Sequence, residues 1–193
     1  MHSRKIIILS LLLFIATLLV FNTDFILKEQ KQPLAVLGKI QDFQLTNQDG
    51  REVTLKSLNG KIWVADFIFT TCGGICPVLS GHMAEIYKVF NSSSEGIRFV
   101  SISVNPENDT PEVLNQYAKR YAADSDKWVF LTGPRASIQK LAVESFKLGS
   151  VTEPIFHSSY FTLVDRYGLI RGYYDGTSDE DLRRLINDAG GFR

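Results

Sequence analysis

Cysteine and histidine are scarce in this 193-residue chain, which has only two cysteines, Cys72 and Cys76, and three histidines. Two cysteines exclude a fold built on several disulfides, so the core must come from buried apolar side chains. Charge of one sign is also lacking, because 21 basic residues balance 21 acidic ones and no run of Lys or Arg occurs. We therefore expect no nucleic-acid partner. The chain has no internal repeat, and its length suits one domain with a tail.

The N-terminal segment differs from the rest of the chain. Arg4 and Lys5 precede an almost unbroken apolar run over residues 6–21. One interpretation is a cleaved signal peptide, since the run is shorter than the roughly 20 residues that span a bilayer. The other is an uncleaved anchor, which the lack of a small-residue cleavage site favours. The sequence thus predicts a cytoplasmic tip, a membrane anchor, a tether and a folded domain, over residues 1–5, 6–27, 28–34 and 35–193.

The positive residues before the run predict that the N-terminus stays in the cytoplasm and that the rest is exported. Only five residues precede the run, which leaves no room for a mitochondrial transit peptide. We therefore expect a single-pass protein of the bacterial inner membrane, with its soluble domain facing the periplasm. That compartment is oxidising, so a free cysteine pair there needs a reductant or a metal.

From residue 35 on, segments typical of strands and helices alternate. The predicted strands are 43–45 and 53–55, which form a hairpin around Asp49-Gly50, then 62–69, 97–104 and 128–131, and a late hairpin of 161–164 and 169–174. The predicted helices are 78–90 with Pro77 at the first position, 111–122 after Thr110, 136–147, and a last helix capped by Ser178. This order predicts an α/β fold with parallel central strands and the late hairpin as an antiparallel edge. A cysteine pair in the first βα connection is the thioredoxin-like arrangement.

The spacing of Cys72 and Cys76 places the two sulfurs one helical turn apart. Two thiolates at this spacing can converge on a metal ion or close a disulfide, and Gly73 and Gly74 leave the loop flexible enough for either. A structural disulfide and a pair of inert buried thiols are the simpler alternatives. Cys76 lies beside the expected helix start at Pro77, where the helix dipole and free amides predict a thiolate.

The chain offers one histidine that could complete a metal site. His2 lies on the wrong side of the membrane, and His82 is poorly placed on its helix to converge with the cysteines. His157 precedes the strand at 160–164, in a loop that a thioredoxin-like fold brings beside the cysteine loop. A solvated loop histidine is the ordinary alternative. Sulfur with imidazole suits Cu(I) and can also hold Cu(II).

Several motifs together resemble the Sco (SenC) family of membrane-anchored copper chaperones, which have a thioredoxin-like fold. The matching segments are 69–72 with Cys76-Pro77, 103–111, 128–133, His157-Ser158, 163–168 and 171–174. The resemblance covers about residues 38 to 190. It implies an α/β, thioredoxin-like domain with an N-terminal β-hairpin and a single N-terminal anchor helix.

The resemblance also implies a function and a site. Carried over by position, the copper ligands of the family fall on Cys72, Cys76 and His157. The family delivers copper to cytochrome c oxidase, so the implied partners are a copper-accepting subunit of that enzyme and a thiol reductant such as a thioredoxin-like protein. The chain departs from the family pattern at Gly73-Gly74-Ile75, at Asn105 and at Phe156, where many members have Pro-Asp-Val, Asp and Asp. These changes keep the ligands and leave the identity of the partner open.

A second function uses the same residues. Cys72 and Cys76 could cycle between dithiol and disulfide as a thiol-disulfide oxidoreductase, so whether the protein is an enzyme stays open. Asp66 has two interpretations as well. In an extended strand it shares a side with Val64 and Ile68, where it could tune a nearby thiol, or it could reach solvent at a strand edge.

Overall fold

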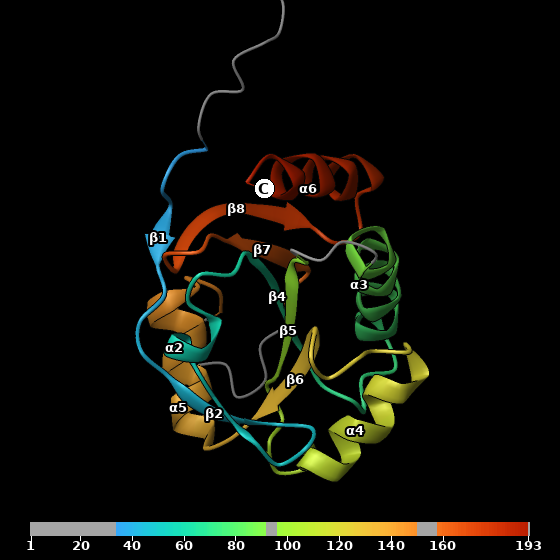
Figure 1. Ribbon diagram of the computed structural model, residues 1–193. Helices are drawn as coiled ribbons and strands as arrows, with labels where there is room; N and C mark the ends of the chain where they lie inside the picture. The colour runs from blue at the N-terminus through green and yellow to red at the C-terminus, as the bar shows by residue number, and fades with distance from the viewer. Residues whose placement is uncertain (1–33, 92–95, 150–157, 193) are drawn as a thin grey trace, which may run out of the picture. The chain divides into compact units, whose positions relative to one another are not determined.

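Eight strands form one mixed sheet in the order β1-β8-β7-β4-β5-β6-β2-β3 (Figure 1). Their bounds are β1 Gly38–Lys39, β2 Gln44–Asn47, β3 Glu52–Thr54, β4 Trp63–Ile68, β5 Arg98–Ser103, β6 Trp128–Thr132, β7 Tyr160–Val164 and β8 Leu169–Asp175. This computed structural model describes residues 34–91, 96–149 and 158–192. The predicted anchor, His157 and Phe156 lie outside these ranges.

The centre of the sheet is parallel, as the sequence predicted. Strand β4 pairs with β5 and β5 pairs with β6, all in the same direction. Every residue of β4 is buried. Its side chains alternate between the two faces, so Trp63, Ala65 and Phe67 enter one core cluster while Val64 and Ile68 enter the other. The carboxyl ends of β4, β5 and β6 therefore meet at one edge of the sheet.

Both sides of the sheet are extended by antiparallel strands. The late hairpin of β7 and β8 joins β4 through β7, and the hairpin of β2 and β3 joins β6 through β2. The prediction that the late hairpin forms the sheet edge is wrong. The short strand β1 covers β8, with Gly38 opposite Ile170 and Lys39 opposite Leu169. A strand of two residues is too short to show an alternating pattern, which is why the sequence did not reveal it.

Helices cover both faces of the sheet, which gives three layers (Figure 1). Their bounds are α2 Leu55–Leu58, α3 Ile75–Asn91, α4 Pro111–Arg120, α5 Arg135–Lys140 with a π-helical turn η1 Leu141–Ser145, and α6 Asp179–Gly191. Helices α3, α4 and α6 bury side chains such as Leu79, Leu114 and Leu185 in one cluster. Helices α2 and α5 with η1 bury Leu58 and Ile138, among others, in the cluster on the opposite face.

Two helices differ from their predicted bounds. Helix α3 starts at Ile75, so Pro77 is its third residue and not its first. The first amides of a helix have no partner inside it, and a proline there removes no hydrogen bond. The single helix predicted over residues 136–147 is α5 followed by η1. Phe146 ends this wider turn, fully buried and edge-to-face against the rings of Trp63 and Phe67.

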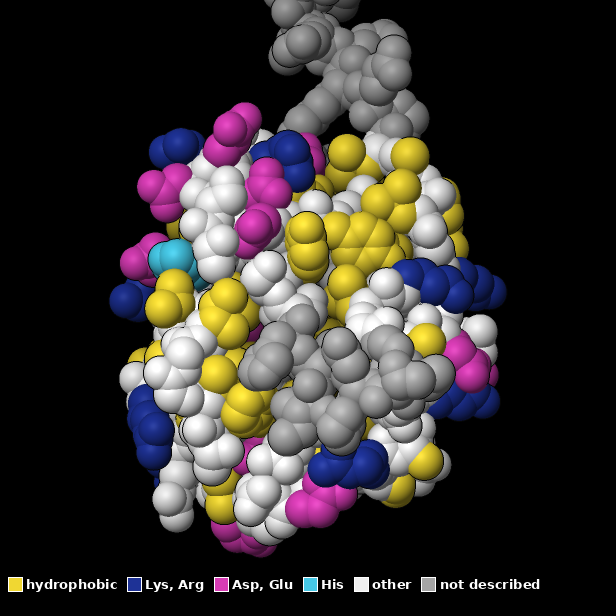
Figure 2. All heavy atoms as spheres, turned by 180° about the vertical axis from the view of Figure 1, so that it is seen from behind, with side chains coloured by type: hydrophobic (Ala, Val, Ile, Leu, Met, Phe, Trp, Pro, Cys, Tyr) yellow, Lys and Arg dark blue, Asp and Glu magenta, His cyan; other side chains and the backbone are white. Residues whose placement is uncertain are grey.

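The predicted caps of α4 and α6 are confirmed. The Thr110 hydroxyl accepts a hydrogen bond from Val113 N at 3.4 Å, and the Ser178 hydroxyl accepts one from Asp181 N at 3.3 Å. Basic and acidic side chains are interspersed over the described part of the face in Figure 2. Within the described ranges, no helix is long and apolar enough to cross a membrane.

Candidate functional site

The cysteines lie in the connection between β4 and α3 and in the first turn of α3. A tight turn follows β4, and it is closed by a hydrogen bond from Cys72 N to Phe69 O at 3.2 Å. Cys76 is the second residue of α3, so the pair spans the loop and the first helical turn. This is the edge where the parallel strands β4 and β5 both end. The fold therefore places the thiols at the carboxyl end of the sheet.

Both cysteines are free, and their surroundings differ. Cys72 is half-buried, whereas Cys76 is buried, with 3% of its surface exposed. The two side chains lie within hydrogen-bonding reach of each other. Gly73 and Gly74 between them are exposed. A Cβ built on Gly73 would meet no atom of the described residues within 4 Å.

The amides that start helix α3 act on Cys72. Burial raises the pKa of the Cys72 thiol, but hydrogen bonds from the backbone amides of Cys76, Gly74 and Ile75 and from the Cys76 side chain outweigh it. The net pKa lies below the ordinary cysteine value. These amides belong to the unpaired donors at a helix start, which favour negative charge. Cys72 is therefore the thiol that ionises first.

Cys76 behaves in the opposite way. Burial raises the pKa of its thiol to about 12, and the neighbouring charges of Cys72 and Asp66 add to the rise, although the Phe69 amide opposes it. The sequence-based prediction that Cys76 carries the thiolate is wrong. The reason is that Cys76 sits inside the first turn with its sulfur turned into the core, whereas the sulfur of Cys72 lies over the free amides.

Asp66 is fully buried in the central strand, so the interpretation as a strand-edge residue that reaches solvent is wrong. Neither carboxylate oxygen makes a hydrogen bond of standard geometry with the described residues, although the Ser101 hydroxyl lies close by on the paired strand. Burial raises the pKa of this carboxyl group to about 7, and the hydroxyl of Ser101 on the paired strand opposes only part of the rise. Its charge also raises the pKa of Cys76, so Asp66 does act on a thiol of the pair.

The histidines divide as follows. His82 is half-buried on α3, and its Nδ1 lies 2.7 Å from the carbonyl oxygen of Gly176, to which it donates. This contact links helix α3 to the end of β8, so His82 has a structural role. His157 lies outside the described residues. Among the residues that are described, no group of three or more His, Cys, Asp or Glu side chains could hold a metal ion.

One residue that the sequence did not mark as functional, Asp109, contacts the cysteine turn, and Asn105, a departure from the family pattern, lies in the same loop. Asp109, in the loop after β5, is fully buried, and its carboxylate accepts hydrogen bonds from Thr70. Asn105 is buried in the same loop, and its carbonyl oxygen accepts from the amides of Asn108 and Asp109 at 3.1 and 3.0 Å. Both lie in segments of family resemblance, but nothing local indicates that Asp109 contacts the loop of Cys72.

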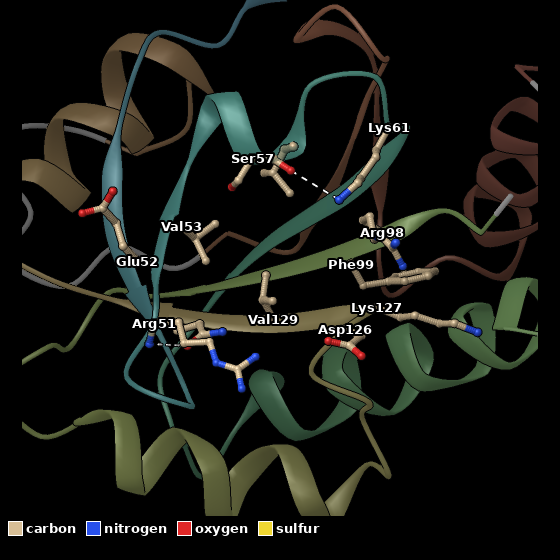
Figure 3. A pocket seen from close by; sticks show the side chains of 12 residues that line it. Arg51, Glu52, Val53, Ser57, Lys61, Arg98, Phe99, Asp126, Lys127 and Val129 are labelled. Carbon is tan, nitrogen blue, oxygen red and sulfur yellow. Dashed lines mark hydrogen bonds between the residues drawn. The ribbon is translucent and has the colours of Figure 1, made fainter. Parts of the chain in front are cut away.

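A pocket occurs at the opposite end of the parallel strands (Figure 3). Lys61, Arg98 and Lys127 line it, and they lie within two residues of the first residues of β4, β5 and β6. Asp126 and Glu52 line it too, so the charges are mixed. Since these strands end at the cysteines, the pocket is separate from the thiol pair.

Comparisons with known proteins agree with this arrangement. The sequence pattern of the family described as SCO1/SenC matches residues 32–188. The SCO1 protein homolog of Bacillus subtilis (strain 168) is 38% identical over 157 residues, which cover 78% of this chain and 81% of that protein.

Solved structures are similar as well. BsSco, described as a member of the Sco family of cytochrome c oxidase assembly proteins and as having a disulfide switch, is 36% identical with a TM-score of 0.74. The match covers 83% of this chain and 97% of that one. Bradyrhizobium japonicum ScoI with copper bound is 25% identical with a TM-score of 0.66, over 82% of this chain and 100% of that one. With its thiol pair on the β4–α3 connection of a thioredoxin-like sheet, the chain belongs to the SCO1/SenC family.

Proposed function

We propose that this protein is a copper chaperone, which binds copper through Cys72, Cys76 and His157 and delivers it to a copper enzyme such as cytochrome c oxidase. The observation that carries the proposal is the pair of free sulfurs, within hydrogen-bonding reach of each other where the parallel strands β4 and β5 end. Two thiolates and an imidazole suit Cu(I) and can hold Cu(II). The copper-bound ScoI and the oxidase-assembly family of BsSco support it.

The two thiols differ in exposure, and this difference suits a protein that must release its bound copper to a recipient. Cys76 is buried and holds copper from the protein side, whereas Cys72 is half-exposed and can be approached by a ligand of the recipient. Gly73 and Gly74 beside it are exposed and carry no side chain that could block that approach. Copper binds only the reduced pair, so the cycle requires a thiol reductant such as a thioredoxin-like protein in the oxidising compartment.

A copper titration of the reduced full-length chain in detergent tests the ligand set. We expect binding of about one copper per chain, and we expect His157→Ala to weaken it by more than about 100-fold, since even the outer partners of metal ligands contribute about 10–100-fold. His82→Asn is the matched control, because an asparagine amide can still donate to the Gly176 carbonyl. It should bind copper like the wild type. Full retention of copper by His157→Ala would exclude the three-ligand site.

A second candidate function is thiol-disulfide exchange by the same pair. The lowered pKa of the half-exposed Cys72 favours it, because an accessible thiolate is the attacking group in such reactions. Cys76 would then resolve the mixed disulfide. If the wild type takes up no copper but reduces a disulfide substrate, this function replaces the chaperone function.

We further propose that residues 6–27 anchor the chain in the bacterial inner membrane and that the domain over residues 35–193 faces the periplasm. The support is Arg4 and Lys5 ahead of the apolar run, and the lack of a small-residue cleavage site after it. The mass of the mature protein distinguishes the anchor from a cleaved signal peptide. A chain that retains its N-terminal residues in the membrane fraction supports the anchor.

A further inference from the structure

The buried carboxylate of Asp109 links the loops that follow β4 and β5 through hydrogen bonds. Asp109 Oδ2 accepts a hydrogen bond from Thr70 N at 3.1 Å, and Asp109 Oδ1 accepts one from the Thr70 hydroxyl at 2.5 Å. The Ser103 hydroxyl also donates to Asp109 Oδ2, at 2.5 Å. Asp109 is fully buried and Thr70 is half-buried, so the carboxylate end of each bond is shielded from water. Thr70 is therefore held at two points by a residue 39 positions away.

The turn that Asp109 holds contacts both sulfurs of the pair. It runs from Phe69 to Cys72, and the hydrogen bond from Cys72 N to Phe69 O closes it around Thr70. Its last residue is Cys72 itself. Its first residue, Phe69, donates its backbone amide to the sulfur of Cys76. A displacement of Thr70 would therefore move one sulfur directly and remove a hydrogen bond from the other.

Asp109 is itself held firmly. Its backbone amide donates to Asn105 O at 3.0 Å, and the next residue, Thr110, caps helix α4. Asn105 N in turn donates to the Ser103 hydroxyl at 3.0 Å. The carboxylate is thus fixed by the end of β5 and the start of α4, two elements that do not carry the cysteines. A rigid scaffold of this kind can set the position of a neighbouring loop.

We propose that Asp109 is a positioning residue, which holds the Phe69–Cys72 turn through Thr70 and so keeps the two sulfurs within reach of each other. This deepens the proposed function, since a metal carrier and a dithiol both need the sulfurs at a fixed separation, but it does not depend on copper. Two reactive groups that a protein holds in the right geometry react with each other as if each were present at high concentration. Loss of the Thr70 contact should therefore lower the effective concentration of one thiol at the other.

The experiment measures the equilibrium constant for formation of the Cys72–Cys76 disulfide against glutathione, in the full-length chain without metal. We expect Thr70→Val, which removes the hydroxyl and keeps the shape, to lower this constant by about five-fold or more. Ser178→Ala is the matched control, because it also removes one hydroxyl hydrogen bond, at the cap of α6, but leaves every bond of Asp109 and of the cysteine turn in place. It should stay within about two-fold of the wild type. Thr70→Ser keeps the hydroxyl and should restore the wild-type constant.

The control separates positioning from general loss of stability. Both Thr70→Val and Ser178→Ala remove one hydroxyl hydrogen bond, so both should weaken the fold, and urea unfolding of each variant measures by how much. If the two variants change the disulfide constant equally, or if Thr70→Val leaves it unchanged or raises it, Asp109 does not position the thiols. A failure of the wild type to bind copper would leave this result intact, because no metal enters the measurement.

Discussion

At the scale of single residues, the two thiols differ because their surroundings differ and not because of their order in the chain. The sulfur of Cys72 meets amides at the start of α3, which favour its thiolate. The sulfur of Cys76 is buried and lies near the charges of Cys72 and Asp66, which disfavour its thiolate. Cys72 is thus the thiol that can exchange ligands or disulfides, whereas burial protects Cys76 from reaction.

This asymmetry predicts selective alkylation. With iodoacetamide at pH 7.5 and no metal, we expect Cys72 in the Cys76→Ser variant to react at least about ten-fold faster than Cys76 in the Cys72→Ser variant. Each variant loses the influence of the other thiol, but burial, the largest cause for Cys76, remains. Mass spectrometry of the modified chain gives both rates. Equal rates, or a faster Cys76, would contradict the assignment.

At the scale of elements, helix α3, the start of β7 and the end of β8 meet at Gly176. Its amide donates to Ser159 O at 2.7 Å, and its carbonyl oxygen accepts from His82. A Cβ built on Gly176 would lie 2.5 Å from Leu79 Cδ2 and 2.9 Å from Ser159 O. These distances are shorter than any van der Waals contact, so the three elements can approach this closely only around a glycine.

We therefore expect Gly176→Ala to lower the free energy of unfolding by about 1–3 kcal/mol, because the added methyl group must displace backbone and a buried leucine. Gly81→Ala is the matched control within α3, since a Cβ there meets no atom within 4 Å. It should raise the free energy of unfolding by about 0.5–1 kcal/mol, through the better helix propensity of alanine. Urea unfolding with an unchanged m-value measures both. A neutral Gly176→Ala would show that the contact can relax.

At the scale of the whole molecule, the sheet encloses one carboxyl group that makes no hydrogen bond of standard geometry with the described residues. Asp66 lies in the central strand with its side chain on the face that α3, α4 and α6 cover. Burial raises its pKa from 3.8 to about 7. The folded protein therefore keeps a proton that the unfolded chain releases between about pH 4 and pH 7. The contribution of Asp66 to the free energy of unfolding therefore falls as pH rises through this window, and it is constant at higher pH.

Asp66→Asn removes this term, because an amide does not titrate. We expect the stability of the variant relative to the reduced, metal-free wild type to rise between pH 4 and pH 8, by on the order of 2–4 kcal/mol. The comparison of the two pH values cancels the other effects of the substitution, such as an amide buried without partners. Urea unfolding at both pH values provides the measurement. A difference that does not change with pH would mean that Asp66 titrates as it does in the unfolded chain.

Much of the domain follows from local patterns. The caps at Thr110 and Ser178 and the buried run of β4 identify their elements, because each depends on neighbours within a few residues. Helices between the central strands predict the parallel pairing of β4, β5 and β6. The two residues of β1 are too few to show an alternating pattern, and Pro77 does not mark the start of α3 because a proline fits the third position of a helix as well as the first.

For the site, the sequence by itself determined which residues carry the chemistry. Cys72 and Cys76 are the only cysteines, and their spacing at a strand-to-helix junction predicts cooperating thiols. Only the tertiary structure decided that Cys72 is the thiol that ionises first, that Asp66 is fully buried and acts on Cys76, and that Asp109 holds Thr70 from 39 residues away. The physical reason is that burial and hydrogen bonds set the properties of a thiol, and both come from strands that are neighbours in the sheet but distant in the chain.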